Sequence, residues 1–443
     1  MIIGSSRLAL AVNDSENVAE VLLECGAIRE AGTLFLRHFA GKPACLFADE
    51  NTWAAAGAEV ERALVAKGIV VRHHILPATP RPKPSVELAG ELGQVLALDD
   101  GIAVAIGSGV INDLVKHAAF TLGRPYLCVA TAVSMDGYTS AGAPLSVRGF
   151  KKTIQCKPPV AVLADLDVLA NAPAEMTSWG YSDLAGKVAA GADWILADAL
   201  GIEPVDPGSW SMVQDELRNW LGRPAQVKQG DAEALAGLFS GLAMVGFAME
   251  RHGSSRPASG SDHQIAHLWE MEGLAHKGEA VSHGACVAIG TLSVVALYEW
   301  LLASGVNGID AEAVVASAPN FDGKVQLIHA AFGAGEMAER AIEETRAKHL
   351  EKQAHRDRLR QLVAAWPALS RRLEQQLPGL KQVQGWLDDA GAPRDAASIG
   401  VTREHLHNSI LNARFLRSRY TVLDVLEETG LLPQAASRVA VLI

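Results

Sequence analysis

The first third of the chain alternates short runs of apolar, β-prone residues with stretches whose apolar residues recur at helical spacing. Two helices are predicted between the strands: residues 53–67, which Gly68 ends, and residues 86–98, which follow a proline-rich connector. The predicted strands cover residues 44–48, 69–76, 101–106, 126–130 and 160–164. Strands that alternate with helices in this way are typical of βαβ units, so the pattern predicts a parallel sheet.

Beyond Pro173 the strand pattern fades, and the chain becomes rich in Ala, Leu and Glu within amphipathic runs. We therefore place a boundary near residue 170, between an α/β domain of residues 1–170 and a mainly helical domain of residues 171–443. A chain of 443 residues is longer than one compact core usually supports, which agrees with two domains. The Arg-, Glu- and Gln-rich stretch 351–376 is interpreted as one solvated helix face.

Composition narrows the class of protein. Hydrophobic residues make up 49% and charged residues 20% of the chain, unlike a disordered protein. The formal net charge of -11 opposes binding to nucleic acid or to an anionic membrane surface. No targeting segment and no run of about 18 apolar residues is visible, so no membrane span is expected. The five cysteines are widely spaced without a CxxC pair, which fits the reducing cytoplasm.

The third predicted strand runs directly into a glycine-rich turn, Gly107-Ser108-Gly109, which opens a predicted helix. Glycines at such a turn let phosphate oxygens approach the backbone amides at a helix N-terminus. Asn112 stands where the third glycine of G-x-G-x-x-G belongs, so the turn alone equally fits a tight strand-to-helix connection. A Walker-type loop at residues 180–187 is rejected, because Val188 stands where Ser or Thr is required.

Metal-ligating residue types gather later in the chain. His263 and His267 are four residues apart and would share one helix face, but Gln264 replaces the general-base glutamate of a metalloprotease helix. His283 adds a third imidazole, and Asp183 adds a carboxylate within an Ala-rich helix. One Asp and two His around a divalent cation leave coordination positions open for a substrate oxygen, as in catalytic sites. From spacing alone, His263 and His267 are the pair expected to share the metal.

Several blocks resemble a known family. The segment 107–116, GSGVINDLVK, resembles the signature of the iron-containing alcohol dehydrogenase and glycerol dehydrogenase superfamily. The blocks 180–187, 255–263, 269–272 and 417–424 are similar to the bacterial branch of the sn-glycerol-1-phosphate dehydrogenases, and the resemblance extends from about residue 15 to 435. It implies a dehydroquinate synthase-like fold, in which a Rossmann-like dinucleotide-binding domain precedes an all-helical domain that binds metal and substrate.

The resemblance also implies roles for individual residues. The metal ligands would be Asp183, His263 and His283. The catalytic residues, facing the substrate, would be Asp136 and His267, which then lines the substrate pocket instead of binding metal. The cofactor would contact Asp49, Gly107, Ser108, Gly109, Asp113, Thr131, Ser134 and Ser140, the last of which would also face the substrate. Within that set Asp49 would meet the adenine ribose, favouring NAD without excluding NADP, and Asp113 with Lys116 would fix the turn.

The implied reaction is a reversible, NAD(P)H-dependent reduction of dihydroxyacetone phosphate to sn-glycerol 1-phosphate, with one divalent metal as Lewis acid. Zinc suits an Asp-His-His site best, and nickel and iron also accept these ligands. The partner is then a small phosphorylated triose, and we expect a homo-oligomer, namely a homodimer. Candidate cations for the substrate phosphate are Arg148, Lys151, Lys152 and Arg256. Asp262 stands where relatives usually carry Glu, a change that we expect to leave coordination intact.

Three other functions remain open. A polyol dehydrogenase acting on unphosphorylated glycerol would share the fold and the ligands. A cyclase of the dehydroquinate synthase type would share the fold and the nicotinamide but return the cofactor unchanged. A non-catalytic cofactor-binding protein would retain the fold without needing the metal ligands.

Overall fold

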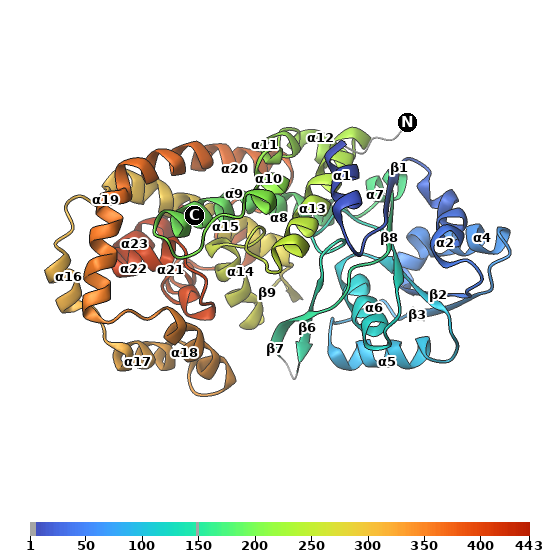
Figure 1. Cartoon of the computed structure of the whole chain (residues 1–443), viewed down its shortest axis with the longest axis horizontal. Coiled ribbons are helices and arrows are strands. Elements are labelled where there is room, and N and C mark those ends of the chain that lie inside the picture. The colour runs from blue at the N-terminus through green and yellow to red at the C-terminus, as the bar shows by residue number, and fades with distance from the viewer. Residues whose placement is uncertain (1–5, 148–149) are drawn as a thin grey trace. The chain divides into compact units, whose positions relative to one another are not determined.

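The computed structural model describes residues 6–147 and 150–443, and Figure 1 shows its elements. By internal contacts the chain forms two compact units, each assembled from several segments. The first comprises 1–184, 211–254 and 389–391, and the second comprises 185–210, 255–388 and 392–443. The contact-based units are therefore discontinuous, whereas the sequence predicts a single boundary at residue 170. The difference arises because helical segments beyond that boundary pack with the sheet-bearing unit.

The first unit contains a six-stranded parallel sheet in the order β1-β8-β5-β4-β2-β3. Its strands are β1 (Glu20–Glu24), β2 (Ala44–Asp49), β3 (Val71–Leu76), β4 (Ile102–Gly107), β5 (Tyr126–Ala130) and β8 (Ala161–Asp165). All five predicted strands are confirmed, and so is the parallel sheet. β1 was not predicted, nor was the antiparallel pair β6 (Gly142–Val147) and β7 (Phe150–Gln155).

Helices cover the sheet on both faces, as the βαβ pattern requires. α2 (Ala31–Phe39) and α4 (Ala58–Ala66) share one apolar core with alternate residues of the central strands, among them Leu46, Val104 and Leu163. α5 (Val86–Leu96) packs against α6 (Gly109–Thr121), which contacts β4. The remaining helices of this unit are α1 (Ser6–Asp14), η1 (Ala27–Glu30), α3 (Glu50–Thr52), η2 (Trp53–Gly57), α7 (Leu166–Ala170), α8 (Ala174–Ala185), α10 (Pro207–Gln214), α11 (Leu217–Trp220), α12 (Pro224–Lys228) and α13 (Ala232–His252).

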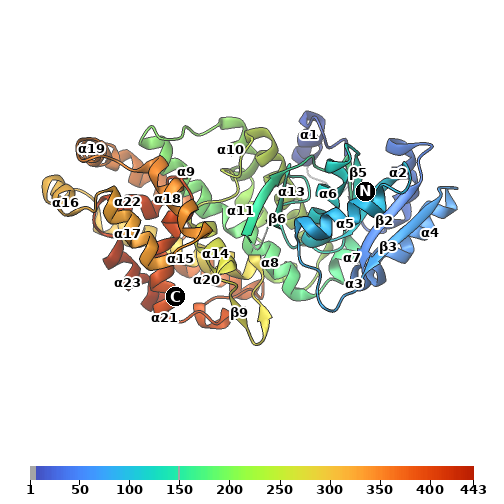
Figure 2. The same ribbon diagram turned by 90° about the horizontal axis from the view of Figure 1, so that it is seen from below.

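The second unit is built almost entirely from helices, in agreement with the prediction for the C-terminal part. Its central element is α15 (His283–Ser304), whose residues are buried nearly all round, with α14 (Ser261–Met271) packed along it; Figure 2 shows both from below. The other elements are α9 (Lys187–Ala199), β9 (Ala275–His276), β10 (Glu279–Ala280), α16 (Ala311–Ser317), α17 (Phe321–Phe332), α18 (Glu336–Lys348), α19 (Lys352–Gln376), α20 (Leu380–Asp389), η3 (Ala396–Ile399), α21 (Arg403–Asn412), η4 (Ala413–Leu416), α22 (Val422–Glu428) and α23 (Leu432–Leu442).

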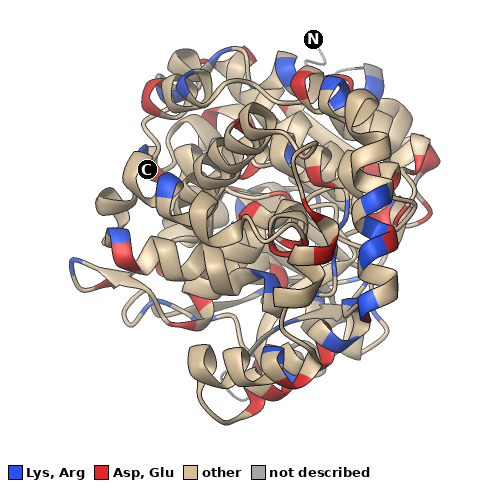
Figure 3. Cartoon of the chain, turned by 90° about the vertical axis from the view of Figure 1, so that its left-hand side faces the viewer, with Lys and Arg blue, Asp and Glu red and all other residues tan. Residues whose placement is uncertain are grey.

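Two described helices, α13 and α15, have the length and apolar composition to cross a membrane. Of the apolar window of α13, 78% is buried, and of that of α15, 83%, as is usual for core helices of a globular fold. α19 is the predicted solvated helix: it turns Leu359, Leu362 and Leu373 inward and charged residues outward. In the view of Figure 3 the basic and acidic segments are interspersed.

Candidate active site

A large pocket lies within the first unit, next to the carboxyl ends of the parallel strands. Its volume is about 1300 Å³, and three of the predicted cofactor residues line it, namely Asp49, Ser108 and Thr131. They follow or end three neighbouring strands, β2, β4 and β5. Open α/β sheets bind their ligands at this edge, where loops from adjacent strands meet. The pocket is therefore the candidate cofactor site.

The glycine-rich turn connects β4 to α6 at the pocket. Gly107 ends the strand, Ser108 is the N-cap residue, and the helix begins at Gly109. A Cβ atom on Gly107 would lie 2.6 Å from Cβ of Ile111, so only glycine lets the first helical turn close onto the strand. The N-cap side chain makes no capping hydrogen bond, which leaves the first amides of α6 for an anion.

Asn112, which breaks the ordinary glycine fingerprint, has a packing role. Its side chain is fully buried, and its amide oxygen accepts a hydrogen bond of 3.1 Å from the Tyr126 hydroxyl of β5. The third glycine of the fingerprint normally allows close contact between helix and strand. Here a side-chain hydrogen bond joins the helix to the neighbouring strand instead.

Asp49 ends β2 and begins α3. Its Oδ1 accepts a hydrogen bond of 2.8 Å from the amide of Thr52, whose hydroxyl faces the Asp49 amide at 3.0 Å, forming a capping box. This bond fixes the carboxylate at the rim of the pocket and occupies one of its two oxygens. The pocket is also lined by three arginines, Arg29, Arg62 and Arg81.

Lys116 fixes the loop that follows β5. Its side chain is fully buried, and its ammonium donates hydrogen bonds to three loop carbonyls, those of Gly137, Ser140 and Gly142, at 2.8, 3.0 and 2.9 Å. Burial lowers the pKa of Lys116, and Asp113, whose carboxylate lies 3.7 Å away, opposes that shift. Lys116, with Asp113 beside it on α6, therefore holds the loop as well as any role in the turn that the resemblance implies.

The same loop carries the predicted residues Thr131, Ser134, Asp136 and Ser140. The Thr131 amide donates a hydrogen bond to the Gly107 carbonyl, and this bond joins the loop to the glycine-rich turn. A Cβ on Gly180 would lie 2.0 Å from the Val133 carbonyl oxygen, so α8 passes directly against the loop. Among these residues only Thr131 lines the large pocket.

Three imidazoles cluster within the second unit. His263 and His267 lie one turn apart on α14, and His283 is the first residue of α15. The ring centroids of His263 and His283 are 5.3 Å apart, and those of His267 and His283 are 5.4 Å apart. His263 is 5% exposed, so its ring has been withdrawn from solvent.

Each of these rings is held by a carboxylate at Nδ1. Asp262 Oδ2 lies 2.8 Å from Nδ1 of His263, while the two oxygens of Glu270 lie 2.8 Å from Nδ1 of His267 and of His283. A carboxylate that accepts from Nδ1 places the ring proton there, so Nε2 carries the lone pair, which is the form in which a neutral imidazole can bind a metal. No role was predicted for Glu270, although its place three residues after His267 on one helix face was a usable signal.

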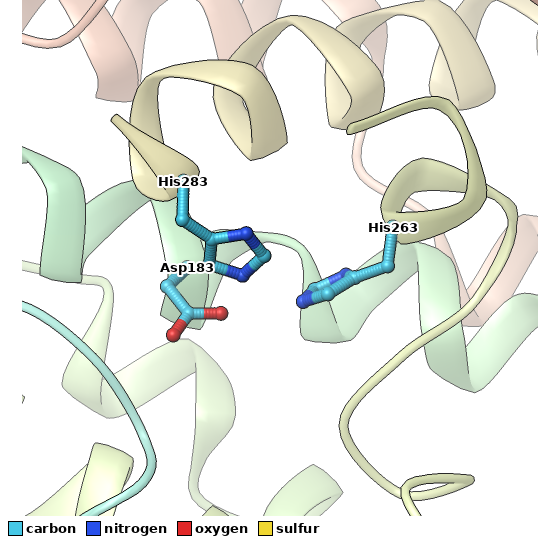
Figure 4. Close-up of side chains that lie close together, drawn as sticks. All are labelled: Asp183, His263 and His283. Atoms are coloured by element: carbon cyan, nitrogen blue, oxygen red, sulfur yellow. The ribbon is translucent and has the colours of Figure 1, made fainter. Parts of the chain in front are cut away.

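The predicted metal-ligand set is brought together. Ligand atoms of Asp183, His263 and His283 all lie within 4.8 Å of one another (Figure 4). One carboxylate and two imidazoles form a donor set that suits a divalent transition metal. His267, Glu270 and His283 form a second group by distance. Because both Glu270 oxygens already face imidazole Nδ1 atoms, this second group supports the ligands and is a poor metal site.

The candidate phosphate cations differ in placement. Arg256 is fully buried and donates to the backbone carbonyls of Asp193 and Tyr420, at 2.8 and 3.2 Å, with Nε 3.3 Å from Glu203. These partners favour a structural role for Arg256. Lys152 lies on β7 and is half-buried. Arg148 and the side chain of Lys151 lie outside the described residues.

Comparison with known proteins gives the family. The sequence model of the protein family described as iron-containing alcohol dehydrogenase matches residues 22–173 of this chain. A glycerol-1-phosphate dehydrogenase (NAD(P)+) of Bacillus velezensis is 29% identical over 437 residues, covering 97% of this chain and 94% of that protein. One of Pyrococcus horikoshii is 30% identical over 281 residues, covering 63% of this chain and 78% of that protein. The chain belongs to the glycerol-1-phosphate dehydrogenase family.

Solved structures confirm the fold expected of this glycerol-1-phosphate dehydrogenase family member. Glycerol dehydrogenase from Schizosaccharomyces pombe superposes with a TM-score of 0.60 at 15% identity, covering 95% of this chain and 90% of that one. A butanol dehydrogenase from Thermotoga maritima gives a TM-score of 0.59 at 16% identity, with coverages of 96% and 98%. At such identity the likeness concerns the fold alone.

Proposed function

We propose that this chain reduces dihydroxyacetone phosphate to sn-glycerol 1-phosphate with NADH or NADPH, and that Asp183, His263 and His283 hold one divalent metal ion for the reaction. The observation that carries the proposal is the pair of carboxylates at Nδ1 of His263 and His283. Such partners orient imidazoles and raise their basicity for metal binding. Membership of the glycerol-1-phosphate dehydrogenase family supports the choice of substrate.

The chain's own residues have separate tasks in this proposal. The amides at the start of α6, with Ser108, bind the cofactor pyrophosphate, and Asp49 accepts from the adenine ribose. Thr131 and Ser134 border the nicotinamide on a loop held by Lys116, with Gly107, Gly109, Asp113 and Ser140 completing that contact surface. The backbone amide of Asp136 orients the Asp183 carboxylate. His267, whose Nδ1 is directed to Glu270, holds a proton near the substrate.

A bound divalent cation supplies Lewis acidity toward the ketone oxygen, and the nicotinamide supplies the hydride. We favour zinc, with nickel and iron as the other ions that this donor set accepts. We also propose that the protein works in the cytoplasm as a homodimer. Light scattering of the purified protein tests the homodimer, and a monomer mass would reject it.

The test is an assay of NADH oxidation with dihydroxyacetone phosphate, dihydroxyacetone and glyceraldehyde side by side. Charge-assisted contacts to the phosphate, each worth roughly 1.5–3 kcal/mol, should make the phosphorylated ketone the best substrate by a wide margin. Lys152→Met should reduce that preference if Lys152 reaches the phosphate. Equal efficiency on the two ketones would replace the proposal by a polyol dehydrogenase.

The product's configuration is a second, independent test. A ketone held in one orientation in a chiral site would present only one face of C2 to the nicotinamide, so one enantiomer should form. An enzyme selective for sn-glycerol 3-phosphate should leave the product untouched. Consumption of the product by that enzyme would show that the stereochemical assignment is wrong.

A further inference from the structure

A buried carboxylate outside the candidate metal site connects the two helices that carry the histidines. Asp193 lies on α9, is fully buried, and belongs to the same unit as α14 and α15. Neither the sequence nor the family resemblance assigned it a role. Its carboxylate accepts four hydrogen bonds from three residues, and each of these residues lies on a different helix.

One oxygen of Asp193 caps the helix of His263 and His267. Oδ2 accepts from the amide of Ser261 at 2.6 Å and from its hydroxyl at 2.7 Å. Ser261 is the first residue of α14, whose N-cap residue, Gly260, has no side chain to serve as a cap. A Cβ on Gly260 would lie 2.5 Å from this same oxygen, so the glycine makes room for a cap supplied from another helix.

The other oxygen reaches the helix of His283. Oδ1 accepts from the Tyr298 hydroxyl on α15 at 2.6 Å and from the amide of Val422, the first residue of α22, at 2.8 Å. α14 and α15 also touch closely, because a Cβ on Gly290 would lie 2.3 Å from the Asp262 carbonyl oxygen. The spacing of the two helices is therefore fixed by backbone contact at Gly290 and by Asp193.

We propose that Asp193 is a positioning residue of the metal centre: by joining the first turn of α14 to Tyr298 of α15, it sets the separation of the His263 and His283 imidazoles and thereby the affinity for the metal. The inference rests on the proposed metal site. A ligand pair on two helices can bind one ion tightly only if the helices cannot slide relative to each other. Asp193 opposes such sliding through side-chain hydrogen bonds at the first turn of α14, in addition to the backbone contact at Gly290.

Tyr298→Phe is the decisive variant, because it breaks the link to α15 while leaving the cap of α14 intact. Tyr420→Phe is its matched control, since the Tyr420 hydroxyl also donates to a carboxylate, that of Glu428, at 2.6 Å. The measurements are the dissociation constant for Zn²⁺ by competition with a chelating dye, the visible spectrum of the Co²⁺-loaded protein, and the melting temperature of the metal-free protein. Asp193→Asn is the stronger perturbation of the link between the helices, because its amide NH₂ would face either the Ser261 donors or the donors of Tyr298 and Val422.

For Tyr298→Phe we expect Zn²⁺ to dissociate about tenfold more readily and the Co²⁺ bands to shift, as outer-shell changes typically weaken metal sites by about 10–100-fold. Tyr420→Phe should lower the melting temperature of the metal-free protein comparably while leaving both metal readouts unchanged. Asp193→Asn should weaken Zn²⁺ binding further, and if it fails to fold, Tyr298→Phe alone decides.

Other outcomes separate this inference from the proposed function. Equal Zn²⁺ affinity in wild type, Tyr298→Phe and Tyr420→Phe would overturn the positioning role and leave the proposed function standing. Weakened Zn²⁺ binding in Tyr298→Phe, in a protein that does not reduce dihydroxyacetone phosphate, would support the positioning role and reject the proposed substrate. A wild-type protein that binds neither Zn²⁺ nor Co²⁺ would overturn both.

Discussion

The backbone amide of Asp136 donates a hydrogen bond of 3.2 Å to Oδ2 of Asp183. Asp136 belongs to the loop that Lys116 fixes, and Asp183 is the proposed carboxylate ligand of the metal, so the bond joins cofactor loop and metal ligand within one unit. A carboxylate that accepts at one oxygen presents the other in a defined direction. The loop thus both borders the proposed nicotinamide site and orients the proposed metal ligand Asp183.

We expect His263→Ala and His283→Ala to abolish metal binding and activity while preserving the fold. Each removes one imidazole from a three-ligand set, which should weaken binding by more than about 100-fold. Metal content by mass spectrometry and circular dichroism of the metal-free proteins are the measurements. His329→Ala, on the exposed face of α17, is the control. Full metal occupancy in both site variants would contradict the ligand assignment.

Asp49 should control the choice between NADH and NADPH. A carboxylate beside the ribose repels the 2′-phosphate, so Asp49→Asn should raise the ratio of kcat/KM for NADPH to that for NADH about tenfold, which corresponds to about 1.4 kcal/mol. The asparagine oxygen can still accept from the Thr52 amide, which preserves the cap. Asp49→Gly should give a similar ratio and lose only roughly a few tenths of a kcal/mol of stability, because glycine is itself tolerated at an N-cap. An unchanged ratio in both variants would place Asp49 away from the ribose.

The sheet could be predicted because its central strands are buried on both faces and therefore appear as continuous apolar runs. β1 was missed because it lacks such a run. It is an edge strand, only Leu23 of its five residues is buried, and glutamates occupy both ends. The hairpin β6–β7 contains Pro144 and two lysines, which mask its strand pattern.

The site was predictable only in part. Spacing along one helix places His263 and His267 on a common face, but Glu270 holds His267 and His283 together across two helices. The role of Asp193 is still harder to predict, since its hydrogen-bond partners Ser261 and Val422 lie 68 and 229 residues further along the chain. Local periodicity carries no information about such contacts, because they depend on how whole helices pack.

Lys116→Met should loosen the cofactor loop. Methionine fills a similar volume but donates no hydrogen bonds, so three loop carbonyls would lose their common partner. We expect the KM for the cofactor to rise about tenfold and the free energy of unfolding to fall by about 3 kcal/mol. Lys42→Met removes an exposed lysine paired with Asp100 and should change neither quantity. Normal cofactor affinity in Lys116→Met would show that the loop holds its shape without the ammonium.

Glu428 should make the protein less stable as the pH rises toward neutrality. Its carboxyl is buried at the end of α22, where it accepts from the Tyr420 hydroxyl, and burial raises its pKa to about 7 from the ordinary 4.5. A raised pKa means that the folded state holds the proton more tightly than the unfolded state does. Its stabilising contribution is therefore complete below about pH 4.5 and is lost as the pH rises through about 7.

Glu428→Gln keeps an acceptor for the Tyr420 hydroxyl but cannot ionise, so the variant should lose less stability than the wild type between pH 5 and about 8. The expected difference between the two proteins in that loss is on the order of 2 kcal/mol in the free energy of unfolding, measured by chemical denaturation. The neighbouring Glu427, whose pKa is lowered to about 2, is ionised across this range in both folded proteins, so its contribution to stability is the same in the two. The exposed Glu374→Gln on α19 is the control, and it should follow the wild type. If Glu428→Gln also follows the wild type across this range, Glu428 is ionised throughout and its burial does not hold the proton.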